Sequence, residues 1–379
     1  MSACRYCGHE NDPAATHCCG CATEILPIEP PQAPPLFPRA QVSPRYLDLA
    51  RVEGAFNFED GFSRPQWDTI RAAIESIVAR EEQELAWGEA VVQWLCQTAS
   101  DLGGNYWLAE SESFFLLSPV SPVTASNLLR FAGRARDVIQ RNLKEMAWRP
   151  AHREVILIFE EEDDYYTYLA HFYESDQMPR TAGVHMRSGY PHVALVFRNE
   201  ADACHTVAHE LTHAALHGLP APLWVEEGVC ETLRRMIGPP QVTVGEGNSN
   251  VYWAAVSGWM PPVMWGELSE RHHEFWDEKN IQEFWAGVSF GGEQEPQQLS
   301  YSLAEVIVHL LSGDHEGFLD FISRAHSDDA GQTAALECLG RNLGDVVAEF
   351  LGPGNWRPYR KAMVDIWAAA TPRQDATTD

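Results

Sequence analysis

The five-residue segment His209-Glu210-Leu211-Thr212-His213 constrains the fold of this chain more than any other feature. Two histidines four residues apart project from one face of a helix, because four residues make about 1.1 helical turns. Such a pair can share a single metal ion, and the carboxylate of Glu210 can then reach a water molecule held on that ion. The segment therefore predicts a helix that carries a metal site, with His209 and His213 as two of the ligands.

The residues around this segment favour a helix that packs into the core. Its flanks are apolar, with Val207-Ala208 before it and Ala214-Ala215-Leu216 after it. Asn199 stands where an N-cap residue belongs, and Gly218 ends the predicted helix close to His217. A surface helix with accidental histidines would have polar flanks instead.

Four histidines follow one another at four-residue spacing, but only the middle pair encloses a glutamate. The four are His205, His209, His213 and His217. Each step of four residues rotates the side-chain direction by about 40°, so all four cannot meet one ion. We therefore interpret His205 and His217 as histidines whose ring nitrogens are satisfied locally.

A catalytic zinc site needs a third protein ligand and one open position. Downstream, the segment from 223 to 231, Leu-Trp-Val-Glu-Glu-Gly-Val-Cys-Glu, resembles the WLxEGxAE segment of gluzincin metallopeptidases, the group that includes thermolysin and aminopeptidase N. This resemblance, which extends over roughly residues 120–350, implies that Glu227 binds the zinc. It also implies that Glu231, one turn later, orients a ligand histidine from outside the metal shell. Glu226 and Glu231 remain alternatives for the third ligand.

The same resemblance predicts a hydrogen-bond donor on a later helix. Gluzincins have a helix that begins with tyrosine after the third ligand, and the segment 301–305, Tyr-Ser-Leu-Ala-Glu, is similar to it. A phenol at that place could stabilise the oxyanion of a tetrahedral intermediate. Tyr301 is the candidate, with simple packing as its alternative role, and Tyr252, His185 and Tyr190 are the reserve candidates.

The N-terminal region contains two CxxC pairs, Cys4 with Cys7 and Cys18 with Cys21, separated by ten residues. This spacing predicts a closed, structural Cys4 zinc site and resembles the short zinc ribbons found at the ends of otherwise unrelated proteins. Cys19 could exchange with Cys18 as a ligand. The sequence thus predicts two zinc ions per chain, one catalytic and one structural. Because the module carries little positive charge, a protein partner is favoured over nucleic acid.

The chain is expected to contain five segments. They are a zinc ribbon at 1–24, a proline-rich linker at 25–46, an N-terminal α/β part at 47–200, a helical part with the metal segment at 201–370, and a polar tail at 371–379. Within the α/β part, residues 154–159 predict a buried strand, and residues 183–197 predict a hairpin that turns near Gly189. The fold class implied by the resemblance is α+β. It would be a thermolysin-like zincin core with a small mixed sheet and a helical C-terminal part, preceded by the ribbon.

Charge and hydropathy exclude several classes of partner. The formal net charge of −27 opposes binding to nucleic acid or to anionic lipid. No run reaches the ~18 apolar residues of a spanning helix, and the N-terminus has no signal-peptide pattern. We therefore expect a cytoplasmic protein without a membrane segment. The cysteines outside the ribbon should be reduced thiols, namely Cys96, Cys204, Cys230 and Cys338.

A second group of possible ligands, His272-His273-Glu274, is interpreted as a set of surface residues, because neighbouring side chains in a helix or strand point apart. The sequence as a whole then predicts a zinc-dependent metallohydrolase. It would be a peptidase that cleaves peptide or protein substrates with a zinc-activated water and Glu210 as general base. The alternative is a non-catalytic zinc-binding scaffold or adaptor with the same fold and a ribbon that docks on protein. A scaffold has no need of Glu210, which favours the enzyme.

Overall fold

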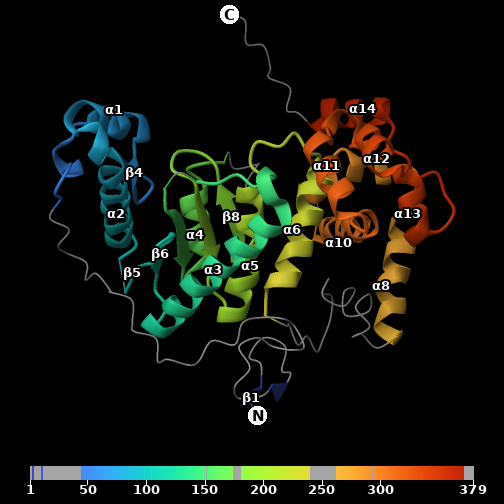
Figure 1. Cartoon of the computed structure of the whole chain (residues 1–379), viewed down its shortest axis with the longest axis horizontal. Coiled ribbons are helices and arrows are strands. Elements are labelled where there is room, and N and C mark those ends of the chain that lie inside the picture. The colour runs from blue at the N-terminus through green and yellow to red at the C-terminus, as the bar shows by residue number, and fades with distance from the viewer. Residues whose placement is uncertain are drawn as a thin grey trace, which may run out of the picture. The chain divides into compact units, whose positions relative to one another are not determined.

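The computed structural model describes residues 2–3, 10–11, 44–103, 105–150, 152–173, 181–239, 262–291 and 294–370 (Figure 1). In these residues the protein is of the mixed α+β class, with a small sheet and many helices. The chain forms two compact units, each assembled from separated segments. The first comprises Met1–Arg141, Arg149–Ala214 and Ile237–Pro240, and the second comprises Asn142–Trp148, Ala215–Met236 and Gln241–Asp379. The segment boundaries expected from the sequence remain predictions.

The first unit contains all the strands of the described residues. The strands are β1 (Ser2–Ala3), β2 (Glu10–Asn11), β3 (Phe56–Glu59), β4 (Phe62–Pro65), β5 (Trp107–Glu110), β6 (Phe114–Ser118), β7 (Glu154–Phe159), β8 (Gly183–Met186) and β9 (His192–Val196). Its α-helices are α1 (Trp67–Ile77), α2 (Gln83–Asp101), α3 (Pro122–Leu143), α4 (Glu162–Leu169) and α5 (Glu200–Ala215), and short 3-10 turns lie at Leu49–Arg51 and Arg80–Glu82.

A five-stranded mixed sheet forms the centre of this unit, with the order β5-β6-β7-β9-β8. The strands β6, β7 and β9 are parallel, and the two edge strands β5 and β8 run antiparallel to their neighbours. The middle strands are buried along nearly their whole length. Continuous apolar runs of this kind are typical of strands covered on both faces, because alternate side chains point to opposite sides. The expected strand at 154–159 and the hairpin with a turn at Gly189 are confirmed.

Helices cover both faces of the sheet. On one face, Leu157 and Phe159 of β7 belong to a buried cluster with Trp94 of α2 and Tyr165 of α4. On the other face, the guanidinium of Arg136 in α3 lies 5.3 Å from the ring of Phe114. A smaller core joins α1 and α2 to the segment that enters the unit, through residues such as Leu47, Leu49, Ile70, Ile74, Ala86 and Ala90. These contacts hold α2 on the sheet.

Helix α5 follows the hairpin directly and packs close to its edge strand. A Cβ atom built on Gly183 of β8 would lie 2.2 Å from Cγ2 of Thr206, so any other residue there would force the Thr206 side chain or the helix to shift. At the start of α5, the side-chain oxygen of Asn199 accepts a hydrogen bond from the backbone N–H of Asp202 at 3.0 Å. The expected N-cap is thereby confirmed, and the hairpin and the cap together set the position of the helix.

The second unit is helical. Its α-helices are α6 (Leu223–Ile237), α8 (Pro262–Phe275), α9 (Ile281–Trp285), α10 (Gln294–Leu311), α11 (His315–Arg324), α12 (Gln332–Leu339), α13 (Leu343–Leu351) and α14 (Arg360–Ala370), with 3-10 turns at Lys144–Met146, Val288–Gly291 and Ser327–Asp329. Helix α6 begins at Leu223. Trp224 near its start is completely buried, and its indole N–H donates to the carbonyl of Ala330 at 3.0 Å.

Helices α6 and α10 pack against each other at a glycine. A Cβ atom on Gly228 would lie 2.6 Å from the carbonyl oxygen of Ala304 and 2.6 Å from Cγ2 of Val308. About two helical turns further along α6, the guanidinium of Arg235 pairs with the buried carboxylate of Glu305 in α10 through both carboxylate oxygens. The close contact and the ion pair hold α6 in a defined position relative to α10.

The expectation that His272 lies on the surface is wrong. His272 on α8 has no exposed area, whereas its neighbours His273 and Glu274 are exposed as expected. Its Nδ1 accepts a hydrogen bond from the indole N–H of Trp276 at 2.9 Å, so its Nε2 carries the proton and donates to the hydroxyl of Ser302 at 3.1 Å. Burial lowers the pKa of His272 to about 3. It is a neutral core residue.

Candidate metal centre

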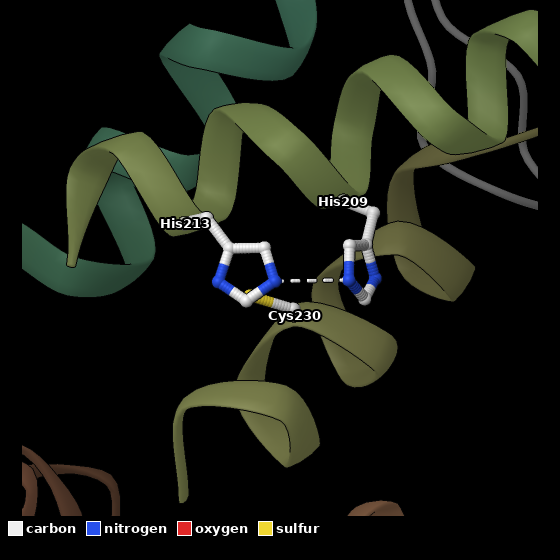
Figure 2. A group of neighbouring side chains, drawn as sticks. All are labelled: His209, His213 and Cys230. Atoms are coloured by element: carbon white, nitrogen blue, oxygen red, sulfur yellow. Dashed lines mark hydrogen bonds between the residues drawn. The ribbon is translucent and has the colours of Figure 1, made fainter. Parts of the chain in front are cut away.

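The two histidines of the metal segment lie side by side on α5. Their Nε2 atoms are 3.0 Å apart, and their ring centroids are separated by 4.8 Å at an interplanar angle of 69°. Figure 2 shows both imidazoles extending from one face of the helix. This is the arrangement that four-residue spacing on a helix predicts, and it is a direct consequence of the continuous helix Glu200–Ala215.

The two imidazoles fit a shared zinc ion after a small change of side-chain rotamer. In a tetrahedral zinc site, two ligand atoms at ordinary bond lengths are roughly 3.3–3.6 Å apart. The two Nε2 atoms lie 3.0 Å apart without an ion.

Glu210, the proposed base, is almost completely buried at 5% exposure. Two phenols of the first unit are close enough for its charge to affect them. Burial raises the pKa of Tyr165, and the nearby Glu210 carboxylate raises it further. The pKa of Tyr173 is likewise raised, first by burial and then by Glu210. The helix thus brings its carboxylate into an aromatic environment from which bulk water is largely excluded.

The acidic residues of α6 are buried as well. Glu227 and Glu231 are each 7% exposed, and Glu226 is half-buried. The guanidinium of Arg234 donates hydrogen bonds to the carboxylate of Glu231, so at least one oxygen of that carboxylate is already bonded. The predicted ligand role of Glu227 and the supporting role of Glu231 remain predictions.

The candidate oxyanion donors lie in different parts of the structure and have different surroundings. Tyr301 lies in α10 and packs edge-on against Phe290, with ring centroids 5.4 Å apart. The hydroxyl of Tyr190 donates to the carbonyl of Arg153 at 2.5 Å, so it already serves a structural hydrogen bond. His185 lies in the edge strand β8, and Tyr252 falls outside the described residues. The role of Tyr301 in stabilising an oxyanion remains a prediction.

The outer histidines of the α5 series have other surroundings. The Nε2–H of His205 donates to the carbonyl of Pro239 at 2.8 Å. The ring of His217 lies against Trp148, with centroids 5.8 Å apart. The interpretation of both as locally satisfied residues agrees with these contacts.

The predicted ribbon cysteines Cys4, Cys7, Cys18 and Cys21, and Cys19 beside them, lie outside the described residues. Strands β1 and β2 pair antiparallel on either side of the first CxxC pair, with Ser2 opposite Asn11 and Ala3 opposite Glu10. The structural zinc site remains a prediction.

The cysteines expected to be reduced thiols, Cys96, Cys204, Cys230 and Cys338, form no disulfide bonds among the described residues. Their redox state remains a prediction.

No protein-family model matches the sequence, and no curated protein matches it either. Across the described residues, none of the helices combines the length and apolar character needed to cross a membrane.

Proposed function

We propose that the protein is a zinc-dependent hydrolase of peptide bonds, in which His209 and His213 bind the ion and Glu210 is the general base. The observation that carries this proposal is the approach of the two imidazole Nε2 atoms to 3.0 Å on one face of α5. A thermolysin-like zincin core is part of the proposal. Its support is the succession of hairpin, α5 and α6, in the order that the resemblance implies.

The chemistry divides between the ion and the chain. A bound zinc ion would act as a Lewis acid toward a water molecule and toward the carbonyl of the substrate. Glu210 accepts a proton from the attacking water and delivers it to the departing amine. Its low exposure keeps bulk water away from this proton transfer and strengthens the electrostatic interactions around it. Tyr301 is proposed as the donor to the oxyanion.

The third ligand is proposed to come from α6. Glu227 is the candidate from the resemblance, and its side chain is buried on α6 at 7% exposure. Glu231, already bonded to Arg234, suits a supporting role better than a ligand role. The packing of α6 on α10 at Gly228 would hold these side chains in place.

The test is Glu210→Gln in the full-length chain. Removal of a general base costs typically 10²–10⁴-fold in rate, so hydrolysis of a mixed peptide pool should fall by about that factor. The zinc content should not change, whereas His213→Ala should lose one ion per chain. Glu200→Gln, an acidic residue in the first turn of the same helix, is the matched control and should retain wild-type hydrolysis. Hydrolysis by Glu210→Gln at the wild-type rate would contradict the proposed role.

The non-catalytic scaffold is the second candidate. It predicts a wild-type protein that binds its full complement of zinc but cleaves no member of the peptide pool. The ribbon, with a structural zinc held by Cys4, Cys7, Cys18 and Cys21, is proposed as a docking module for a protein partner in either case. A Cys4→Ser variant should then lose one zinc ion without loss of the ion at the histidine pair.

A further inference from the structure

The first unit contains a series of aromatic rings in contact, which begins with three tryptophans. Trp87 of α2 lies 6.0 Å from Trp67 of α1 between ring centroids, and Trp67 lies 5.4 Å from Trp94 of α2. The ring of Trp94 lies 5.2 Å from the imidazole of His192 in β9, and that imidazole lies 5.8 Å from the ring of Tyr168 in α4. Trp87 and Trp67 are half-buried, whereas Trp94, His192 and Tyr168 are 2%, 3% and 5% exposed. The tryptophan series (Trp87, Trp67 and Trp94) thus connects partly exposed indoles to a buried phenol.

The hydrogen bonds at the buried end fix where a phenolic proton can go. The carbonyl of Tyr190 can only accept, so Nδ1 of His192 carries the hydrogen and donates to it at 2.7 Å. Nε2 of His192 is then the acceptor for the hydroxyl of Tyr168, also at 2.7 Å. Burial lowers the pKa of His192 to about 4 and raises the pKa of Tyr168, so at pH 7 the imidazole is neutral and the phenol is protonated. The phenol of Tyr168 therefore has a base in direct contact with its proton.

Tyr190 belongs to the same buried cluster and has a different partner. Its ring lies 5.4 Å from Trp67 and 6.3 Å from Trp94, directly against two members of the tryptophan series. Its hydroxyl donates to the carbonyl of Arg153 at 2.5 Å. A carbonyl satisfies a buried hydroxyl as well as an imidazole does, but it is a far weaker base and cannot hold the proton. The two tyrosines are therefore alike in packing and differ in proton chemistry.

We propose that the tryptophan series conducts an electron vacancy inward to Tyr168, with His192 as the acceptor of the phenolic proton. The co-reactant is a diffusible one-electron oxidant of the radical class, such as the carbonate radical anion, which takes one electron from Trp87 and becomes carbonate. Each oxidised indole then regains an electron from the next ring of the series. In the last step Tyr168 gives an electron to oxidised Trp94 and its proton to Nε2 of His192.

The products of this last step are a neutral phenoxyl radical and an imidazolium, and no bond between heavy atoms breaks. A one-electron reductant such as ascorbate later supplies the electron that restores Tyr168, and His192 returns the proton. Oxidising equivalents that reach the indoles are thereby collected at one phenol, from which they can be removed without covalent damage. This activity does not depend on a metal ion at His209 and His213.

The test uses the azide radical, generated by pulse radiolysis, as the one-electron oxidant of tryptophan in the full-length chain. Time-resolved absorption separates the indolyl radical from the phenoxyl radical. The variants are Tyr168→Phe, which removes the proposed radical site, and Trp94→Phe, which interrupts the series before it. Tyr190→Phe is the matched control, because it removes the hydroxyl of a buried tyrosine from the same cluster. Circular dichroism checks that each variant is folded.

In the wild type, the indolyl absorption should decay as the phenoxyl absorption grows, at a rate independent of protein concentration. Tyr168→Phe and Trp94→Phe should lose most of this intramolecular phase, and Tyr190→Phe should retain it. The frozen wild-type radical should also show, by electron–nuclear double resonance, a proton coupling that disappears in D₂O. That proton is the one transferred to His192, and this measurement needs no variant.

Three results would overturn the proposal. An indolyl radical that persists in the wild type would mean that the rings serve packing alone. Phenoxyl formation in folded Tyr168→Phe equal to that in the wild type, or a loss in Tyr190→Phe as large as in Tyr168→Phe, would mean that the imidazole does not select the radical site. A wild-type phenoxyl radical without an exchangeable proton coupling would exclude His192 as the proton acceptor, even if Tyr168→Phe failed to fold.

Discussion

Gly228→Ala is expected to destabilise the protein, although alanine is the better helix former. The added methyl would lie 2.6 Å from the carbonyl oxygen of Ala304, 2.9 Å from its carbonyl carbon and 2.6 Å from Cγ2 of Val308. Two of these three atoms belong to the backbone of α10, so rotation of a side chain cannot relieve the contact. Helices α6 and α10 must therefore move apart.

The magnitude follows from two opposing effects. Forcing an extra methyl group into a packed contact costs about 1–3 kcal/mol, and the short backbone contact puts Gly228 near the upper end of that range. Replacing glycine by alanine within a helix contributes about 1 kcal/mol in the other direction. The free energy of unfolding should fall by about 2 kcal/mol. Glu227, the proposed third ligand, directly precedes Gly228 in the helix, so the affinity for metal should fall as well.

The measurement is urea unfolding of the full-length chain, followed by tryptophan fluorescence, beside Gly133→Ala. Gly133 lies within α3, and a Cβ atom built on it meets nothing within 4 Å. That control should stabilise the protein by roughly 0.5–1 kcal/mol, because only the helix-propensity effect remains. If Gly228→Ala is as stable as Gly133→Ala, the packing argument for α6 is refuted.

Two further predictions concern buried titratable groups of the first unit. Burial raises the pKa of Glu154 from 4.5 to about 7, although the charge of Arg136 acts in the opposite direction. The stability that the protonated carboxyl contributes is therefore lost as the pH rises from about 4.5 to about 7. Glu154→Gln should remove this loss and increase the free energy of unfolding at pH 8 by about 2–3 kcal/mol, with little effect at pH 4. A variant less stable than the wild type at pH 8 would contradict this prediction. Burial lowers the pKa of His192 to about 4, so stability should be lost as the pH falls from about 6.5 to about 4. Tyr168→Phe removes the hydroxyl that donates a hydrogen bond to Nε2 of His192 at 2.7 Å. The free energy of unfolding at pH 7.5 should fall by about 1–3 kcal/mol in the same assay. An unchanged unfolding midpoint would show that this hydrogen bond contributes nothing to stability.

Much of the local structure of the first unit could be predicted from the sequence. The strand at 154–159, the hairpin before α5 and the N-cap at Asn199 all appear as expected. Each depends on interactions between residues close together in the chain, such as an apolar run, a glycine with positive φ at position 189 or a side chain that satisfies a nearby N–H. The proximity of His209 and His213 is of the same kind, because helix geometry alone brings them together.

Other features could not be predicted because they depend on partners distant in the sequence. His272 was expected at the surface, yet Ser302 of α10 and Trp276 provide hydrogen bonds that make its complete burial tolerable. A histidine beside another histidine and a glutamate gives no local sign of such partners. The burial of His272 depends on the packing of α8 beside α10, which carries Ser302.

The same distinction applies to the candidate metal centre. The sequence by itself determined a helix with two imidazoles on one face and a following helix with several possible ligands. Helix periodicity places Glu227, Cys230 and Glu231 on similar sides of α6 but does not decide which of them lies nearest to the histidines. Only the tertiary structure decided how α6 is held, because its close contact with α10 at Gly228 and the ion pair of Arg235 with Glu305 join segments far apart in the chain.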